Sequence, residues 1–379
     1  MRIQQRSWTR GEGWSGADDW SANDGQLVLI FGTGESLNEQ TPLRDLRAAY
    51  PRAQIIGCST AGEICGTRLL EQSLVATAIA FDDTRIKTVS TAIATADDSR
   101  AAGARLAEQL PAEDLVHVLL ISEGLTVNGS ELVEGLTAGL PENVAVTGGL
   151  SGDGANFTRT WVYSGGTAQS GQVVAIGMYG KKLRVGYGSL GGWDSFGPER
   201  IITRSKGNVL YELDGQSALA LYKRYLGPDA AALPASGLRF PLAIRGPDSP
   251  DSIVRTILAV SEQDQSLTFA GEIPQGFHAR LMRANFDRLI DGASGAARES
   301  RQGLGNAAPE LAILISCVGR KLVLQQRVEE ELEAVRAVLG PAPAMTGFYS
   351  YGEIAPFSQN AKPRLHNQTM TITVFSEAA

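Results

Sequence analysis

The chain contains few of the residues that covalent cross-links and metal centres need, with three cysteines and three histidines among 379 residues. The cysteines form neither a CxxC nor a CxxCH motif, which argues against a disulfide framework and covalent c-type haem. No apolar run is long enough to span a bilayer, and the first residues lack the apolar segment of a secretory signal. We therefore expect a cytoplasmic protein with no membrane partner.

Excess positive charge is also missing, because 34 Lys and Arg residues face 41 Asp and Glu residues, for a net charge of −7. Without a basic cluster, such a chain is a poor ligand for phosphate backbones, so we expect no nucleic-acid partner. The sequence contains no HExxH, GxxxxGK[ST] or GxSxG motif. We expect no catalysis, and the alternative is a hydrolase- or transferase-like enzyme that uses a turn Ser or Glu.

Glycine, by contrast, is abundant, and it marks three copies of one pattern. Each copy has an apolar run, a stretch with helical spacing, and a second apolar run that ends in a Gly/Ser turn. The copies span residues 27–64, 116–154 and 311–354. Apolar strands joined by helices indicate strand pairs covered by helices. Similar turn chemistry predicts that Gly57, Gly148 and Gly347 lie at equivalent strand ends.

The fold class that follows is α/β, with two tandem α/β parts whose mixed sheets are covered by helices. Alternating stretches such as LVATAIAF predict antiparallel strands beside the repeated pairs. A change of composition near Ser195 divides the chain into residues 1–195 and 196–379. In the second part we expect helices at 216–225, after Gly276 and at 321–339. The acidic residues of the last helix, Glu331 among them, are expected to contact water, with docking to a basic partner surface as the alternative.

The Gly/Ser turns are the candidate binding site, because ligands often bind where strand carboxyl ends converge. The candidate turn residues are Gly57, Ser59, Gly62, Glu63, Ser350, Gly352 and Glu353. The alternative is that the glycines serve backbone geometry alone. The acids Glu63, Asp153 and Glu353 are expected to accept hydrogen bonds within their turns.

Several segments resemble the FIST sensory family. LVLIFGTG, IIGCSTAGEI and NVAVTGGLSGDG are similar to its N-terminal half, and GNVLYELDGQSALALY, LTFAGEIPQGF, FYSYGEIAP and LHNQTMTI to its C-terminal half. The two predicted parts then correspond to a FIST N-like and a FIST C-like domain. The resemblance implies a bacterial signal-input protein of the stand-alone type, which senses nitric oxide through haem. Such a protein regulates a separate histidine kinase, diguanylate cyclase or phosphodiesterase.

The same resemblance implies haem b as cofactor, with His366 as the metal ligand and Asn367 beside it in the site. His278 is placed in a predicted helix and His117 in a core strand, so packing is the expected role of both. Cys58 and Cys317 are expected to be buried and inert, with thiolate ligation as the alternative. A haem-free sensor of a small metabolite such as an amino acid is the alternative function.

Overall fold

Three strand–helix–strand units form the body of the protein. The computed structural model describes residues 1–16, 24–249, 251–357 and 361–377. The units are β3 (Leu27–Gly32), α1 (Gln40–Ala49) and β4 (Gln54–Ser59); β9 (Leu115–Ser122), α3 (Gly129–Ala138) and β10 (Ala145–Leu150); and β24 (Leu311–Cys317), α6 (Val318–Leu324), α7 (Val328–Leu339) and β25 (Ala344–Ser350). In each unit the two strands are parallel neighbours. The predicted repeat is confirmed.

Three glycines occupy the same place in these units, in the second strand and opposite a residue of the first. A Cβ atom on Gly57, Gly148 or Gly347 would lie 1.7, 1.8 or 1.7 Å from the carbonyl oxygen of Ile30, Leu120 or Leu314. No side chain fits at that distance, so glycine is required here by close backbone approach. The three positions are equivalent as predicted, but each is the fourth residue of its strand and not at the strand end.

Each unit lies at the centre of its own sheet. The first sheet has the order β12 (Thr167–Gln169), β11 (Val162–Ser164), β4, β3, β7 (Ser73–Ala80), β1 (Arg2–Thr9), β2 (Gly13–Trp14). The second is β27 (Pro363–His366), β26 (Gly352–Pro356), β10, β9, β13 (Gln172–Tyr179), β8 (Arg85–Ala92). The third is β14 (Leu183–Leu190), β28 (Met370–Glu377), β24, β25, β5 (Glu63–Cys65), β6 (Arg68–Leu70). Each sheet has one parallel pair, and its other pairs are antiparallel, so the mixed α/β class is confirmed.

The three sheets exchange hairpins in a cycle. Hairpin β5–β6 follows β4 but pairs with β25 of the third sheet. Hairpin β26–β27 follows β25 but pairs with β10 of the second sheet, and β11–β12 follows β10 but pairs with β4 of the first. The cycle places residues from both predicted parts of the chain in the second and third sheets.

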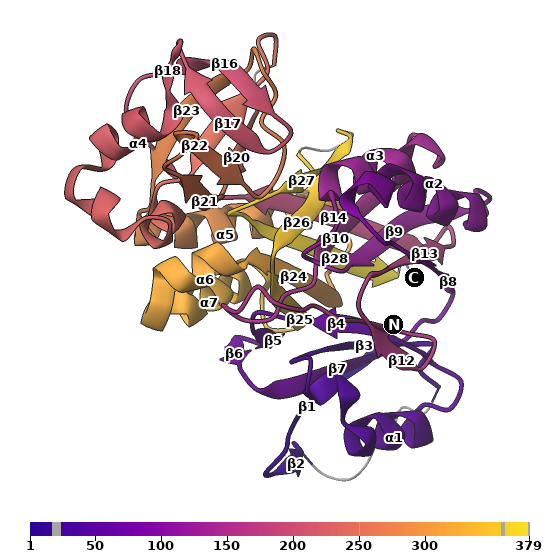
Figure 1. Ribbon diagram of the computed structural model, residues 1–379. Helices are drawn as coiled ribbons and strands as arrows, with labels where there is room; N and C mark the ends of the chain where they lie inside the picture. The colour runs from indigo at the N-terminus through magenta and orange to yellow at the C-terminus, as the bar shows by residue number, and fades with distance from the viewer. Residues whose placement is uncertain (17–23, 250, 358–360, 378–379) are drawn as a thin grey trace.

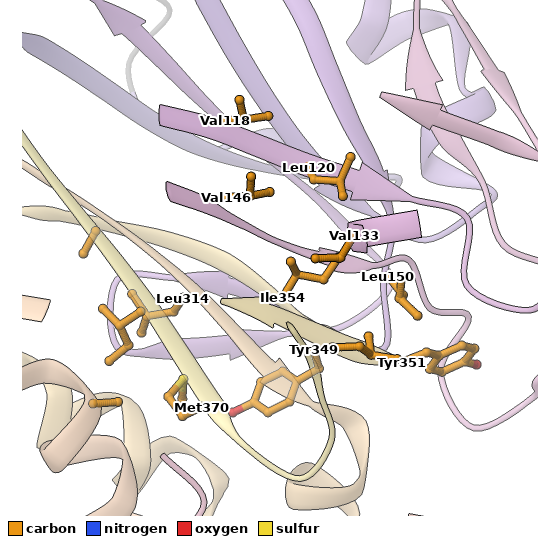
Figure 2. Packing of buried hydrophobic residues seen from close by; sticks show 14 of the residues in the cluster. Val118, Leu120, Val133, Val146, Leu150, Leu314, Tyr349, Tyr351, Ile354 and Met370 are labelled. Atoms are coloured by element: carbon orange, nitrogen blue, oxygen red, sulfur yellow. The ribbon is translucent and has the colours of Figure 1, made fainter. Parts of the chain in front are cut away.

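Helices cover the outer faces of the sheets, and the inner faces meet in a common core. Helix α1 packs on the first sheet, α2 (Ser99–Gln109) and α3 belong to the second, and α5 (Phe286–Gly303) and α7 lie together over the third (Figure 1). The central core collects inward side chains of all three sheets, among them Phe31, Leu119 and Phe348. Figure 2 shows Ile354 of β26 directed toward Val133 and Leu150, so the exchanged hairpin is part of the hydrophobic packing.

A fourth, antiparallel sheet forms a separate lobe with its own core (Figure 1). Its order is β20 (Ser252–Arg255), β19 (Leu242–Arg245), β23 (His278–Arg283), β16 (Arg200–Lys206), β17 (Val209–Leu213), β22 (Ser266–Phe269), β21 (Ile257–Ser261), with β15 (Asp194–Ser195) and β18 (Gln216–Ser217) beside it. Helix α4 (Ala218–Leu226) matches the helix predicted at 216–225. The helix predicted after Gly276 is wrong at its start, because His278 pairs with Arg245 in β23 and α5 begins only at Phe286.

The helix predicted at 321–339 is two helices. Gln325 has φ of 51°, in the left-handed region, and a short 3₁₀ turn at Gln325–Arg327 separates α6 from α7. Glu331 is fully buried instead of facing water, because it lies on the apolar side of α7, three residues after Val328 and four before Val335. No helix within the described ranges is long and apolar enough to cross a membrane.

Candidate functional site

A cleft of about 920 Å³ opens at the carboxyl ends of β3 and β4. The loop after β3, the turn after β4 and the loop before β7 form one side of it, and Trp8 and Arg10 extend it along the end of β1. The loop 153–161, which follows β10, supplies the opposite side, and Lys321 of α6 reaches it from the third unit. All three units therefore contribute to one cleft, in the kind of place where α/β proteins bind ligands.

The turn after β4 is held by a buried carboxyl group. Thr60 Oγ1 donates to Glu63 Oε1 at 2.5 Å, and Ser73 Oγ donates to Glu63 Oε2 at 2.7 Å. Burial raises the pKa of Glu63 to about 7, although these hydrogen bonds and the charge of Lys321 oppose the shift. Glu63 thus fixes the floor of the cleft, as the expected hydrogen-bond acceptor of its turn.

The turn after β25 has the same hydroxyl–carboxyl arrangement, but it lies outside the cleft at the ends of β3 and β4. Ser350 Oγ donates to Glu353 Oε1 at 2.7 Å, and Thr369 donates to Oε2 from its backbone nitrogen and its hydroxyl at 3.1 and 2.9 Å. Burial raises the pKa of Glu353 to about 8. None of these three residues lines the cleft at the ends of β3 and β4, and the arrangement recurs because both turns have the same structure.

The loop 153–161 is tied down by Asp153 and by a tyrosine from the third unit. Asp153 accepts hydrogen bonds from the backbone of residues 157, 158 and 159, and the Tyr351 hydroxyl donates to it. Burial alone would raise the pKa of Asp153, but these donors hold it below its usual value. Tyr351 also stacks on Phe157 with ring centroids 4.5 Å apart. The loop 153–161 is therefore held both by its own Asp153 and by Tyr351 of the third unit.

Three cations line the cleft, and they differ in whether a carboxylate pairs with them. Arg10 pairs with Glu39, and Lys321 pairs with Glu71 and donates to the carbonyl oxygen of Ala61 at 2.7 Å. The guanidinium of Arg159 lies 3.9 Å from the ring centroid of Trp161 and donates to Ser170 at 3.2 Å. Among the described residues, no carboxylate within 4.0 Å pairs with Arg159.

The predicted site residues do not converge on one place. Gly62 and Glu63 line the cleft, and Ser59 lies beneath it, where its hydroxyl accepts a hydrogen bond from the backbone nitrogen of Trp161 at 2.8 Å. Gly57 is buried within the first sheet. The other candidates lie around the exchanged hairpin of the second sheet and the turn before β28, and they are Ser350, Gly352, Glu353, His366 and Asn367.

The surroundings of His366 do not fit a porphyrin. The side chain is 2% exposed, its Nε2 lies 3.0 Å from the carbonyl oxygen of Ala355, and its ring stacks near Phe357. Burial lowers the pKa of His366 to about 4. A haem ligand needs a free nitrogen directed into an apolar slot, whereas Nε2 of His366 faces the carbonyl oxygen of Ala355 and the residue does not line the cleft at the ends of β3 and β4. The neighbouring Asn367 is buried and its amide has no partner among the described residues.

The other candidate metal ligands are also engaged or buried. His117 is buried as expected, with Nε2 3.0 Å from Thr147 Oγ1, and burial lowers its pKa to about 3. His278 lies in a strand, with Nδ1 3.2 Å from Glu199. Burial raises the pKa of the Cys58 and Cys317 thiols. Within the described ranges no three His, Cys, Asp or Glu side chains gather as a metal site needs.

Three residues of the cleft, Arg159, Trp161 and Lys321, are not among those predicted from the sequence. Arg159 and Trp161 lie in a loop outside the repeated motif, and Lys321 was assigned only to a helix. An Arg two residues before a Trp in a Gly-flanked loop is the signal that was available, but nothing local places either beside Lys321.

Comparison with known proteins identifies two domains. A model of the FIST N domain matches residues 26–216, and a model of the FIST C domain matches residues 218–356. No curated protein sequence matches the chain. Among solved structures, a cyanuric acid hydrolase from A. caulinodans has a TM-score of 0.35 at 11% identity, over 100% of this chain and 99% of that one. A second cyanuric acid hydrolase structure has a TM-score of 0.33, at the same identity and coverage.

Proposed function

The chain belongs to the FIST family of signal-transduction sensor domains that bind small ligands, and we propose that its ligand is a small polar metabolite bound in the cleft at the ends of β3 and β4. The observation that carries the proposal is the composition of this cleft. The first unit supplies its floor, the second unit its covering loop and the third unit Lys321. An occupant would therefore contact all three units at once.

The metabolite is favoured over haem by the site geometry. The cleft is lined by charged and hydroxyl side chains, which suit a polar ligand such as an amino acid and do not suit a porphyrin face. His366, on which the haem hypothesis depends, is buried against a backbone carbonyl. Nitric-oxide sensing through haem is the second candidate, supported by the sequence resemblance of the segment around His366.

An enzymatic role is not favoured. The Thr60–Glu63 pair in the cleft has the hydrogen bond of a nucleophile and its base. The same hydrogen bond recurs between Ser350 and Glu353, which lie outside the cleft and hold a turn. We propose instead that occupancy of the cleft regulates a separate signalling enzyme in the cytoplasm, a histidine kinase or a cyclic-di-GMP enzyme, as the family resemblance suggests.

Titration calorimetry of the full chain with each proteinogenic amino acid tests the ligand. Glu35 is an exposed residue of the cleft whose nearest cation, Arg10, is 3.8 Å away, so Glu35→Trp fills the cleft at little cost to the fold. We expect saturable binding that Glu35→Trp abolishes and that Glu142→Trp, an exposed position away from the cleft, leaves unchanged.

A visible spectrum of protein produced with haem supply decides between the two candidates. A Soret band stoichiometric with the chain, lost in His366→Ala and retained in His278→Ala, would overturn the metabolite proposal. Ester turnover lost in Thr60→Val would favour the enzyme instead.

A further inference from the structure

The charges of the cleft are unevenly balanced. Two of its carboxyl groups are satisfied within the protein, since Glu63 accepts hydrogen bonds from two hydroxyl groups and Asp153 accepts them from its own loop and from Tyr351. Arg10 is neutralised by Glu39 at its rim. The lining as a whole has more carboxyl groups than cations, and Glu35 is an exposed carboxylate 3.8 Å from Arg10. Among the described residues, Arg159 is the cation of the cleft without a carboxylate partner, so the positive group offered to an occupant is confined to the side of the cleft that Arg159 forms.

Arg159 is held in place for such a role. Its guanidinium stacks on Trp161, which orders the plane of the fork and leaves the edge with its N–H groups for a ligand. Trp161 is itself anchored by its backbone hydrogen bond to Ser59. Gly34 leaves the space for the indole, because a Cβ there would lie 2.7 Å from Trp161 Cδ1. A stacked, pre-ordered guanidinium binds oxyanions with two parallel hydrogen bonds.

Lys321 is the second cation, and one of its two interactions is more easily broken than the other. The carbonyl oxygen of Ala61 is fixed in the turn after β4. Glu71 is 63% exposed and belongs to the loop between β6 and β7, so water and salt weaken its ion pair with Lys321. An anion in the cleft can replace Glu71 while Lys321 keeps its bond to Ala61.

We propose that the sensed metabolite carries an oxyanion, a carboxylate or a phosphate, which Arg159 binds and which displaces Glu71 from Lys321. The inference rests on the proposed function and specifies its ligand class. Two contacts hold the β5–β6 hairpin to the helices of the third unit. One is the ion pair of Glu71 with Lys321, and the other is the hydrogen bond from the Leu69 backbone nitrogen to the Glu329 carboxylate at 3.0 Å. Displacement of Glu71 removes the first of these contacts. Occupancy of the cleft is thereby coupled to α6 and α7.

Two variants of opposite sign test the proposal, with L-glutamate, succinate and inorganic phosphate as probes in calorimetric titrations. Arg159→Gln should weaken binding by about tenfold or more, as loss of a charge-assisted bidentate contact does. Glu71→Gln should tighten binding by roughly threefold, because the anion no longer competes with a carboxylate for Lys321. A variant that merely damages the fold does not bind more tightly.

Arg10→Gln is the matched control, because it removes a cleft arginine already paired with Glu39. It should change affinity by less than about threefold, the scale of an exposed pair. Arg159→Lys keeps the charge but not the fork, and should recover only part of the loss. Binding of succinate without phosphate assigns the group to a carboxylate, and the reverse assigns it to a phosphate.

The outcomes separate this inference from the proposed function. Suppose that uncharged metabolites bind, that Glu35→Trp blocks their binding and that Arg159→Gln does not weaken it. The cleft is then the binding site, and the proposal that the ligand carries an oxyanion is wrong. If Glu71→Gln weakens anion binding, the competition for Lys321 is wrong. If no probe and no amino acid binds the parent protein, the proposed function fails with it.

Discussion

At the scale of single residues, two buried carboxyl groups define how the turns behave. Glu63 and Glu353 each close a turn by accepting a hydrogen bond from a hydroxyl three residues earlier and another from the residue that opens or precedes an antiparallel strand. Burial favours the neutral carboxyl, and it outweighs the hydrogen bonds that favour the charged form. Both groups therefore hold a proton at pH values at which an exposed glutamate is charged.

The raised pKa of Glu353 predicts a pH-dependent stability. Between its ordinary value of 4.5 and about 8, the folded protein keeps a proton that the unfolded chain has released. The free energy of unfolding therefore falls as the pH rises through this window, by at most about 1.4 kcal/mol per pH unit for one group. Glu353→Gln should flatten that slope, as measured by urea denaturation at several pH values. An unchanged slope in Glu353→Gln, with the same result for the exposed control Glu142→Gln, would show that Glu353 is charged in the folded state.

The turn residues could be predicted from their local sequence, but the cleft could not. Ser59, Gly62 and Glu63 are marked by Gly/Ser turn signals that act over a few residues. Arg159 and Lys321 become neighbours of this turn only because a loop of the second unit and a helix of the third are folded against it. The prediction that His366 joins the Gly/Ser turns in one site depended on sequence proximity to Glu353, which is not the same as facing a cavity.

At the scale of elements, the break between α6 and α7 creates a buried ion pair. Glu331 Oε2 lies 2.7 Å from Arg320 Nη2, with both side chains fully buried. The Tyr349 hydroxyl donates to Glu331 Oε1 at 2.7 Å, and Arg320 Nη2 donates to the Leu289 carbonyl at 2.7 Å. The pair thus joins α6 and α7 to β25 and α5. In a continuous helix, as predicted, the eleven residues between Arg320 and Glu331 would hold the two side chains about 16 Å apart along the axis.

Removing one partner of this pair should cost much more than removing an exposed arginine nearby. Arg320→Leu leaves Glu331 as an uncompensated buried charge, and we expect a loss of about 3–5 kcal/mol in the free energy of unfolding. Arg327→Leu breaks ion pairs with Asp287 and Glu330 that face water, and should cost less than about 1 kcal/mol. Guanidinium denaturation of both variants gives the comparison. Equal losses would mean that the buried pair contributes no more than a surface pair.

Periodicity identified the repeated strands and helices but not their partners. The apolar runs and Gly turns predicted three strand–helix–strand units, and all three are present, each with a parallel pair of strands. The exchange of β5–β6, β26–β27 and β11–β12 could not be predicted, because a hairpin with alternating hydrophobicity fits any sheet edge of the right register. Which edge it joins is decided by the packing of all three sheets.

At the scale of the whole molecule, the exchange closes into a ring that includes the chain ends. Strand β1 forms an outer part of the first sheet, and β28 lies within the third. The Met1 ammonium lies 2.9 Å from Glu310 and 3.4 Å from Glu377, so the two ends meet (Figure 1). Each sheet borrows a hairpin from another unit, and the second and third sheets contain strands from both sides of Ser195.

This closure predicts that the two halves depend on each other to fold. A fragment of residues 1–195 lacks β26 to pair with β10 and β25 to pair with β5, which exposes the apolar edge that Ile354 covers in Figure 2. We expect 1–195 alone to give no cooperative thermal transition, and we expect the two fragments, when co-expressed, to purify as a complex that unfolds cooperatively. Calorimetry of the separate and the paired fragments makes the measurement. A cooperative transition for 1–195 alone would establish that half as an autonomous domain, in which the exchanged hairpins only add to a sheet already stable without them.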